Sequence, residues 1–421
     1  MPNRLPARPA ALHRTRVTAL LALALAAAAP AGIRAQTYQQ ALEAARTADA
    51  QFASQRAGVE GRRSQSRQAG AAYYPSAAVN YNQADVTANG RSTRSVSITQ
   101  PLISYDRYLT LRQADPIAAL AEAELAQADT DLALRVFTAM ADVVRNREQI
   151  RALTVQINGL EEQLRRASRM RELGQGTVTD VSDFRVRVAV AEANRISLRN
   201  ALSAADRNFT LLTGLRGDIP ALQVDVPAWQ DPRPLDMLIG DVRTDAPAAR
   251  SARMNVTLAE IAVKRVKAQY LPQVSAQIAR VSTSGTAGSN ADTSRIAITL
   301  SAPLGFSPYY DNQRAGSEWL RAQESLRFTQ DSLATEVTRL DLAIRSYRDE
   351  VLIRQQALEA ARLSVDANVK SYQGGVKTNI DVVTSYQLLA DAEVALVNAR
   401  LLSSEAHLRL ALLAAPWAAR P

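Results

Sequence analysis

Cysteine is absent from this chain of 421 residues, and histidine occurs only twice. Without cysteine, the chain has no disulfides, no thiolate metal sites and no lipid-modified N-terminal cysteine. His13 lies in the N-terminal segment, so His407 has neither a cysteine nor a second histidine to join in a metal or catalytic site. We therefore expect no metal cofactor and no histidine-based catalysis.

Aromatic residues are also scarce, at 5% of the chain, whereas alanine and arginine are frequent. This composition favours long helices over a compact mixed core. A phosphate-binding loop is excluded as well, although two glycine-rich stretches occur, LGQGTVTDVSDF (173–184) and GGVKTNIDVVTS (374–385). Neither contains the G-x4-G-K-[ST] pattern, and both follow helical rather than strand patterns.

The first 35 residues lack acidic side chains but contain five arginines and the apolar run VTALLALALAAAAPAG. This pattern predicts a signal peptide over residues 1–35, cleaved after Ala35. An uncleaved anchor is the alternative, but the run is shorter than the roughly 20 residues that a membrane helix needs. Removing the segment lowers the formal charge from +9 to about +4, so we expect no nucleic-acid partner. No later apolar run has membrane-helix length, so strands would have to cross any membrane.

Four segments recur in the same order at a spacing of about 197 to 202 residues, which indicates an internal repeat. The pairs are YYPSAAV (73–79) with YLPQVSA (270–276), SITQPL (97–102) with TLSAPL (299–304), the turn 174–180 with 375–381, and LLTG (211–214) with LLAA (412–415). We assign repeat 1 to residues 36–214, an equatorial linker to 215–246, repeat 2 to 247–415 and a C-terminal tail to 416–421.

Each repeat contains one predicted β-hairpin, at residues 76–103 and 272–303. Apolar and polar residues alternate there in runs of about 9 to 11, the length that a tilted strand needs to cross a bilayer. Asn89-Gly90 is a hairpin signal between the first two runs. Aromatic residues near one end of the strands predict a membrane-interface girdle, and a small soluble hairpin rimmed by tyrosines is the alternative. They are Tyr73, Tyr74, Tyr105, Tyr108, Tyr270, Phe306, Tyr309 and Tyr310.

Long helices are predicted after each hairpin. Apolar residues follow three-and-four spacing from Leu125 to Ala167, interrupted at Asp129 and Asn146, and again from Val181 to Leu212, interrupted at Arg195. This is typical of a coiled-coil seam, with rods of about 80 Å and 50 Å. Shorter helices, at about 38–71 and 247–269, precede the two hairpins.

The duplicated YxP strand entries, the PL strand exits and the two G-x5-D-V turns resemble the TolC-type outer membrane efflux proteins over essentially the whole mature chain. The resemblance implies an α+β membrane protein in which each chain contributes four strands to a trimeric 12-stranded β-barrel. Its helices would form a coiled-coil tunnel in the periplasm. It also implies a homotrimer in outer membrane lipid, working with a periplasmic adaptor and an inner-membrane pump, either ABC-type or proton-driven. Such a protein has no cofactor and is not an enzyme.

The resemblance further implies that the tip turns 173–180 and 374–381 form the periplasmic entrance. Thr179 and Asp180 match residues that hold the closed state, with Tyr372 and Lys377 as their partners, and Asp381 matches an aspartate that faces the pore. For both aspartates, the alternative is a helix N-terminal charge with no further role.

The turn glycines are the expected adaptor contacts, namely Gly174, Gly176, Gly374 and Gly375. Thr384 stands where the family has a second acidic residue, which weakens the case for a strong cation block.

Two functional classes are open from the sequence. The first is an outer membrane channel, a passive conduit for efflux of small molecules or type I secretion of proteins. The second is a non-pore periplasmic coiled-coil protein, structural or adaptor-like, although an adaptor would have only one helical hairpin.

Overall fold

The computed structural model describes residues 37–84, 91–215, 233–285, 291–302 and 307–414. The predicted signal peptide, the Asn89-Gly90 turn, Phe306, the tail 416–421 and most of the first half of the linker lie outside the described residues.

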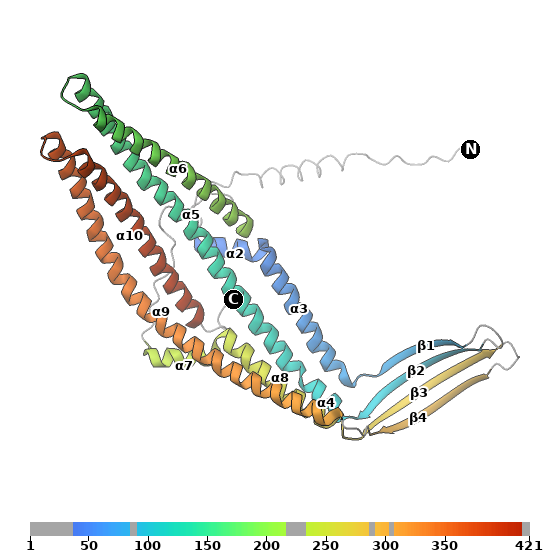
Figure 1. Cartoon of the computed structure of the whole chain (residues 1–421). Coiled ribbons are helices and arrows are strands. Elements are labelled where there is room, and N and C mark those ends of the chain that lie inside the picture. The colour runs from blue at the N-terminus through green and yellow to red at the C-terminus, as the bar shows by residue number, and fades with distance from the viewer. Residues whose placement is uncertain (1–36, 85–90, 216–232, 286–290, 303–306, 415–421) are drawn as a thin grey trace, which may run out of the picture.

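The four strands form one antiparallel sheet in the order β1-β2-β3-β4. The strands are β1 Ser76–Ala84, β2 Arg91–Ile103, β3 Gln273–Gly285 and β4 Ala291–Ser301. The pairing of β2 with β3 joins the two predicted repeats, and the sheet lies at the end of the molecule opposite the helical tips (Figure 1). β1 and β4 are its two edges.

Strand register gathers the apolar residues on one face of the sheet. Val79 lies opposite Val96, and Ile278 lies between Ile98 and Ile296. Because directly paired residues share a face and successive residues alternate, the register places eleven apolar or aromatic residues on this apolar face. They are Ala77, Val79, Tyr81, Val96, Ile98, Val274, Ala276, Ile278, Ile296, Ile298 and Leu300. Serine, threonine, asparagine and glutamine dominate the other face, called the polar face below.

Two long helical hairpins make up most of the chain: α5 Ala114–Glu172 with α6 Val178–Thr213, and α9 Ser307–Gln373 with α10 Asn379–Ala414. They run side by side away from the sheet (Figure 1). The shorter elements are α2 Tyr38–Ala48, α3 Ala50–Gly70, η2 Ala71–Tyr73, α4 Tyr105–Arg112, α7 Leu235–Asp245 and α8 Pro247–Ala268. Long helices with one small antiparallel sheet confirm the predicted α+β class.

The first short helix differs from the prediction, because it is divided at Asp49. This residue has extended backbone angles, φ −72° and ψ 117°, and its carboxylate caps α3 by accepting from the amide of Phe52 at 2.8 Å. Arg135 of α5 donates to the same carboxylate at 2.6 Å. Burial raises the pKa of Asp49, but the hydrogen bonds from Arg135 and Phe52 outweigh burial and hold it below its ordinary value.

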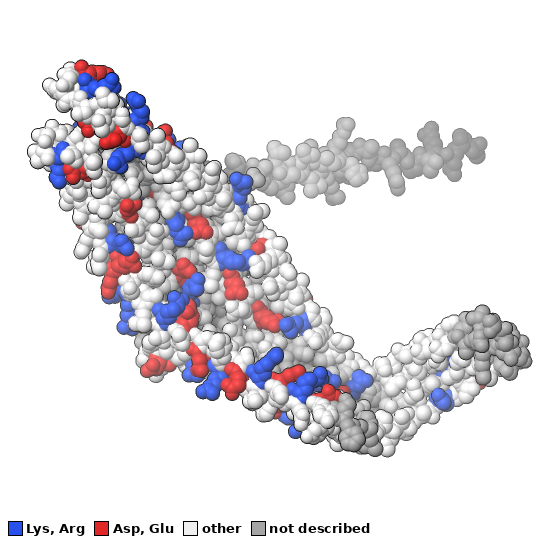
Figure 2. Space-filling model, viewed as in Figure 1, with Lys and Arg blue, Asp and Glu red and all other residues white. Residues whose placement is uncertain are grey.

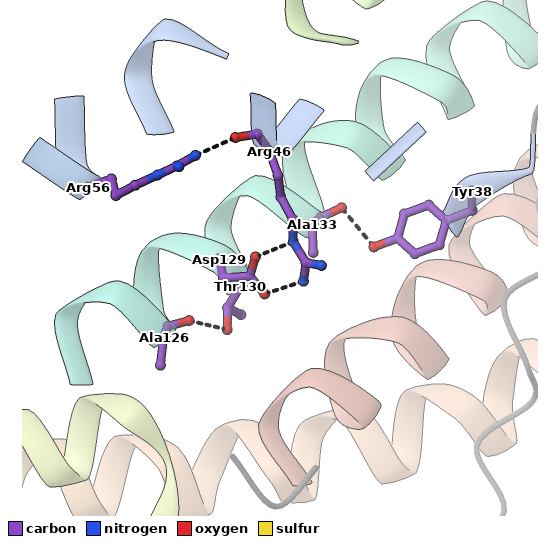
Figure 3. Close-up of polar contacts among 7 residues, drawn as sticks. All are labelled: Tyr38, Arg46, Arg56, Ala126, Asp129, Thr130 and Ala133. Carbon is purple, nitrogen blue, oxygen red and sulfur yellow. Dashed lines mark hydrogen bonds and ion pairs between the residues drawn. The ribbon is translucent and has the colours of Figure 1, made fainter. Parts of the chain in front are cut away.

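Contacts with α5 fix α2 in place (Figure 3). The hydroxyl of Tyr38 donates to the carbonyl of Ala133 at 3.1 Å. Arg46 donates through Nε and Nη2 to the two carboxylate oxygens of Asp129 at 2.8 and 2.9 Å. Asp129 interrupts the apolar seam in the sequence because it serves this bidentate pair.

The predicted linker 215–246 contains a helix, α7. Leu238 and Val242, spaced four residues apart, are buried against Val337 and Leu340 of α9. The Pro- and Asp-rich composition of the linker concealed this apolar pair.

The largest core lies where α2, α5, α6 and α10 meet, and Leu132, Val136, Phe137 and Met140 of α5 are fully buried there. On the helical surface, acidic and basic side chains are interspersed along the rods (Figure 2). Among the described residues, no helix combines the length and the apolar character that a membrane span requires.

Candidate functional site at the helical tips

The two tip turns have the same backbone geometry. Gly174 and Gly375 adopt φ of +73° and +75°, a left-handed conformation that favours glycine. In the first turn the amide of Gln175 donates to the carbonyl of Met170 at 2.8 Å, and the second turn repeats this bond at 3.0 Å. This is the Schellman ending of a helix, so each glycine stops one rod and allows the chain to reverse.

The other two predicted turn glycines have different roles. A Cβ on Gly176 would lie 2.9 Å from the backbone nitrogen of Arg171, so a larger residue would force the turn apart. A Cβ on Gly374 would lie 3.6 Å from the nearest atom, the carbonyl oxygen of Ser371, which is an ordinary contact. Glycine is therefore required at three of the four positions.

Both return helices begin with a threonine hydrogen-bonded to the aspartate three residues later, and each turn makes one of the two reciprocal bonds of a capping box. Thr177 accepts from the amide of Asp180 at 3.1 Å, and its hydroxyl donates to Asp180 Oδ2 at 2.7 Å. In the second turn, the amide and hydroxyl of Thr378 donate to Asp381 Oδ2 at 2.9 and 2.8 Å. The two aspartates thus occupy the helix N-terminal position that was the alternative to a gating role. The hydrogen bonds from the backbone and side chain of Thr378 hold the pKa of Asp381 below its ordinary value.

The second carboxylate oxygen distinguishes the two aspartates. Asp180 Oδ1 accepts from Asn379 Nδ2 at 2.8 Å and so connects the two tips of one chain. Asp381 Oδ1 lies 3.6 Å from Lys377 Nζ, a residue of its own turn. Within one chain, therefore, the partner of Asp180 is Asn379 and not Lys377. No local sequence pattern points to Asn379, because its partner is 199 residues away.

Tyr372 lies against the first tip. Its ring packs edge-on against Phe184 of α6, with centroids 6.5 Å apart and an interplanar angle of 68°. Burial and the nearby charge of Asp180 raise the pKa of Tyr372. Thr179 is exposed. The structure thus brings Asp180 and Tyr372 together, while Lys377 faces Asp381.

A seam between α5 and α10 continues from the tips toward the middle of the rods. Gln156 donates to Gln387 at 2.7 Å, and Arg145 donates to Asn398 at 3.1 Å. Thr384 lines the groove of about 1080 Å³ that lies beside this seam between α5, α6 and α10.

Tyr386 of α10 packs closely against α5 at Gly159 along this seam. A Cβ built on Gly159 would lie 2.4 Å from Cε1 and Cζ of the Tyr386 ring. The ring therefore occupies the space that any other residue at 159 would fill. Sequence reasoning missed this contact, and the only available signal was a glycine inside an otherwise regular apolar pattern.

Comparisons with known proteins agree with this architecture. Residues 238–415 match the family described as outer membrane efflux protein. The alkaline protease secretion protein AprF of Pseudomonas aeruginosa is 24% identical over 317 residues, which are 71% of this chain and 64% of AprF. This chain thus spans less than two thirds of the length of AprF. The outer membrane protein TolC of Salmonella enteritidis is 22% identical over 334 residues, covering 76% of this chain and 68% of TolC.

A solved structure shows the same fold. The outer membrane protein VceC of Vibrio cholerae superposes with a TM-score of 0.72 at 18% identity, over 90% of this chain and 96% of VceC. This likeness confirms the fold class.

Proposed function

We propose that this chain is a member of the outer membrane efflux protein family, which its residues 238–415 match, and that it is the outer membrane channel of a tripartite export system. It is an outer membrane protein whose helices extend into the periplasm. The conduit is passive and carries either small molecules or secreted proteins. The names of the relatives include both protease secretion and efflux, so the cargo is set by the pump and adaptor with which the channel works.

The observation that carries the proposal is the inverted exposure of the sheet. On β2, Val96 is 50% exposed and Ile98 47%, both on the apolar face. Along β2, by contrast, the residues of the polar face from Thr93 to Thr99 are half-buried. A sheet in water would cover its apolar face, whereas a sheet with lipid on one side and an aqueous lumen on the other exposes it.

The open edges of the sheet support association into a trimer. β1 and β4 each have one side without a strand partner in the described chain. Unpaired strand edges are not tolerated in hydrocarbon, because their amide and carbonyl groups find no water there. Three chains placed edge to edge give a closed barrel of twelve strands, and every edge is then paired.

The tips are the proposed periplasmic entrance, with Thr179, Asp180, Tyr372, Lys377 and Asp381 around it. In the closed state, Asp180 and Tyr372 hold the two tips of one chain together through Asn379 and Phe184. Lys377 and Asp381 form only an exposed pair, which contributes little stability and leaves Lys377 able to reach a neighbouring chain.

The proposed partners are two further copies of the chain, a periplasmic adaptor and an inner-membrane pump. The adaptor would contact the tip turns through Gly174, Gly176, Gly374 and Gly375, where the backbone is exposed or nearly so.

Cell fractionation followed by single-channel recording tests the proposal. In fractionated cells, the protein should be found with the outer membranes. After purification, it should migrate as a trimer in detergent and give discrete conductance steps in planar bilayers. A soluble periplasmic protein without conductance would refute the channel and favour the coiled-coil structural class. If the protein does form channels, the genes that neighbour its coding sequence would show whether its partner is an ABC exporter or a proton-driven pump.

A further inference from the structure

The polar face of the sheet carries a single described charge, Arg295. Register places Arg295 of β4 opposite Ala279 of β3, which in turn lies opposite Ser97 of β2. Ser97 pairs with Ala78 of β1. This row crosses the whole sheet on the polar face, and its other members are small. Among the side chains that the structure describes on this face, Arg295 alone is charged; the register also assigns position 91, an arginine at the start of β2, to this face.

Arg295 differs from the other described arginines of the sheet in having no compensating partner. Arg280 and Arg94 lie on the apolar face, where Arg280 makes an ion pair with Asp292 at 3.1 Å and Arg94 lies over the ring of Tyr81 at 5.7 Å. Within the described part of the chain, Arg295 makes neither an ion pair nor a hydrogen bond. A guanidinium group without a partner requires water or an anion.

We propose that Arg295 is a selectivity-determining residue of the channel, forming a ring of three positive charges in the lumen that binds and passes anions. The inference rests on the proposed trimeric channel. Arg295 lies six residues from Ser301, the end of β4 nearest the helices, and so about 20 Å along the strand from that end. The ring therefore lies within the sheet, far from the carboxylates of the tips. Its ligands are carboxylates and phosphates, either free or on exported cargo.

Charge rings of this kind control ion selectivity because the lumen confines ions near the charges. Screening sets the range of the effect, since the Debye length is about 10 Å at 0.1 M salt and about 3 Å at 1 M. The contribution of Arg295 should accordingly be large in dilute salt and small in concentrated salt.

Reversal potentials in planar bilayers test the inference with a matched pair of variants. Arg295→Gln and Arg280→Gln each remove one positive charge per chain, but from opposite faces of the sheet. In a KCl gradient below 0.1 M, Arg295→Gln should lower the chloride-to-potassium permeability ratio several-fold, on the order expected for a luminal charge ring. Arg280→Gln should leave that ratio unchanged, and Arg295→Lys should retain the wild-type ratio.

A polyanion provides a second readout. Tripolyphosphate added to the bath should reduce the wild-type current and have a several-fold weaker effect on Arg295→Gln. The inference would be overturned if Arg295→Gln had the same chloride-to-potassium permeability ratio and the same block by tripolyphosphate as the wild type. It would also be overturned if Arg280→Gln lowered the permeability ratio as much as Arg295→Gln. These results presuppose wild-type channels, so an absence of wild-type conductance would instead refute the proposed function.

Discussion

The contact between Gly159 and Tyr386 allows a quantitative prediction for the seam between the two helical hairpins. Replacing Gly159 by alanine places a methyl group 2.4 Å from two carbons of the Tyr386 ring. Carbon atoms pack best at about 3.5 to 4.0 Å, so the ring or the helix must move by at least about 1 Å. α5 and α10 would have to separate at this contact.

The expected cost follows from two opposing terms. Overpacking of a well-filled contact typically costs about 1–3 kcal/mol, while alanine in a helix gains up to about 1 kcal/mol over glycine. We therefore expect Gly159→Ala to lower the free energy of unfolding by about 1–2 kcal/mol. Gly58→Ala is the matched control, because no atom lies within 4 Å of a Cβ built there. It should stabilise the protein by about 0.5–1 kcal/mol.

Thermal unfolding of the detergent-solubilised protein, followed by circular dichroism at one heating rate, measures these differences. The double variant Gly159→Ala/Tyr386→Leu should be less destabilised than the sum of its two single variants, because the second change removes the ring that causes the clash. If Gly159→Ala melted at or above the wild-type temperature, or if the two changes were additive, the reasoning from this contact would be wrong.

Three further changes test the tips and the N-terminal helix. Asp381→Ala should raise the chloride-to-potassium permeability ratio of single channels, because it removes one negative charge per chain from the proposed entrance. Since hydrogen bonds at the helix cap hold the pKa of Asp381 below its ordinary value, the contribution of its charge should persist on acidification and fade only below about pH 3.9. An unchanged ratio in the variant would exclude a pore-facing role. Asp180→Ala should raise closed-state conductance by breaking the connection between the tips, and traces identical to wild type would argue against a latch. Arg46→Ala, which removes two hydrogen bonds to Asp129, should cost about 1 kcal/mol in thermal unfolding after allowance for solvent screening. Arg63→Ala, in an exposed pair on one helix, should cost almost nothing, so equal losses in the two variants would contradict the assigned role of Arg46.

The sequence was sufficient to predict those features that depend on local periodicity. Alternation identified the strands around Val79 and Ile298, and three-and-four spacing identified the rods, because both patterns are written in neighbouring residues. The polar residues that interrupt the helical pattern have roles that only the structure shows. Asp129 interrupts the seam to bind Arg46, and Arg195 interrupts it beside Glu192 at 3.3 Å.

The contacts that join distant segments could not be predicted in the same way. Asp180 and Asn379 are 199 residues apart, and Gln156 and Gln387 are 231 apart. Periodicity reports which face of a helix is apolar, but it does not fix how two hairpins are aligned along their length. The assigned partner of Asp180 therefore came from resemblance, and within one chain the structure has Asn379 there instead of Lys377.

The length of α9 makes the tips sensitive to small movements at the other end of the molecule. A helix of 67 residues extends about 100 Å, so a rotation of about 5° at the sheet would displace the tip by about 9 Å. The same lever works in reverse. A hydrogen bond at the tips, such as that between Asn379 and Asp180, lies as far as possible from the sheet and therefore opposes rotation of the helices most effectively. A few weak contacts at the tips can thus hold the proposed entrance closed.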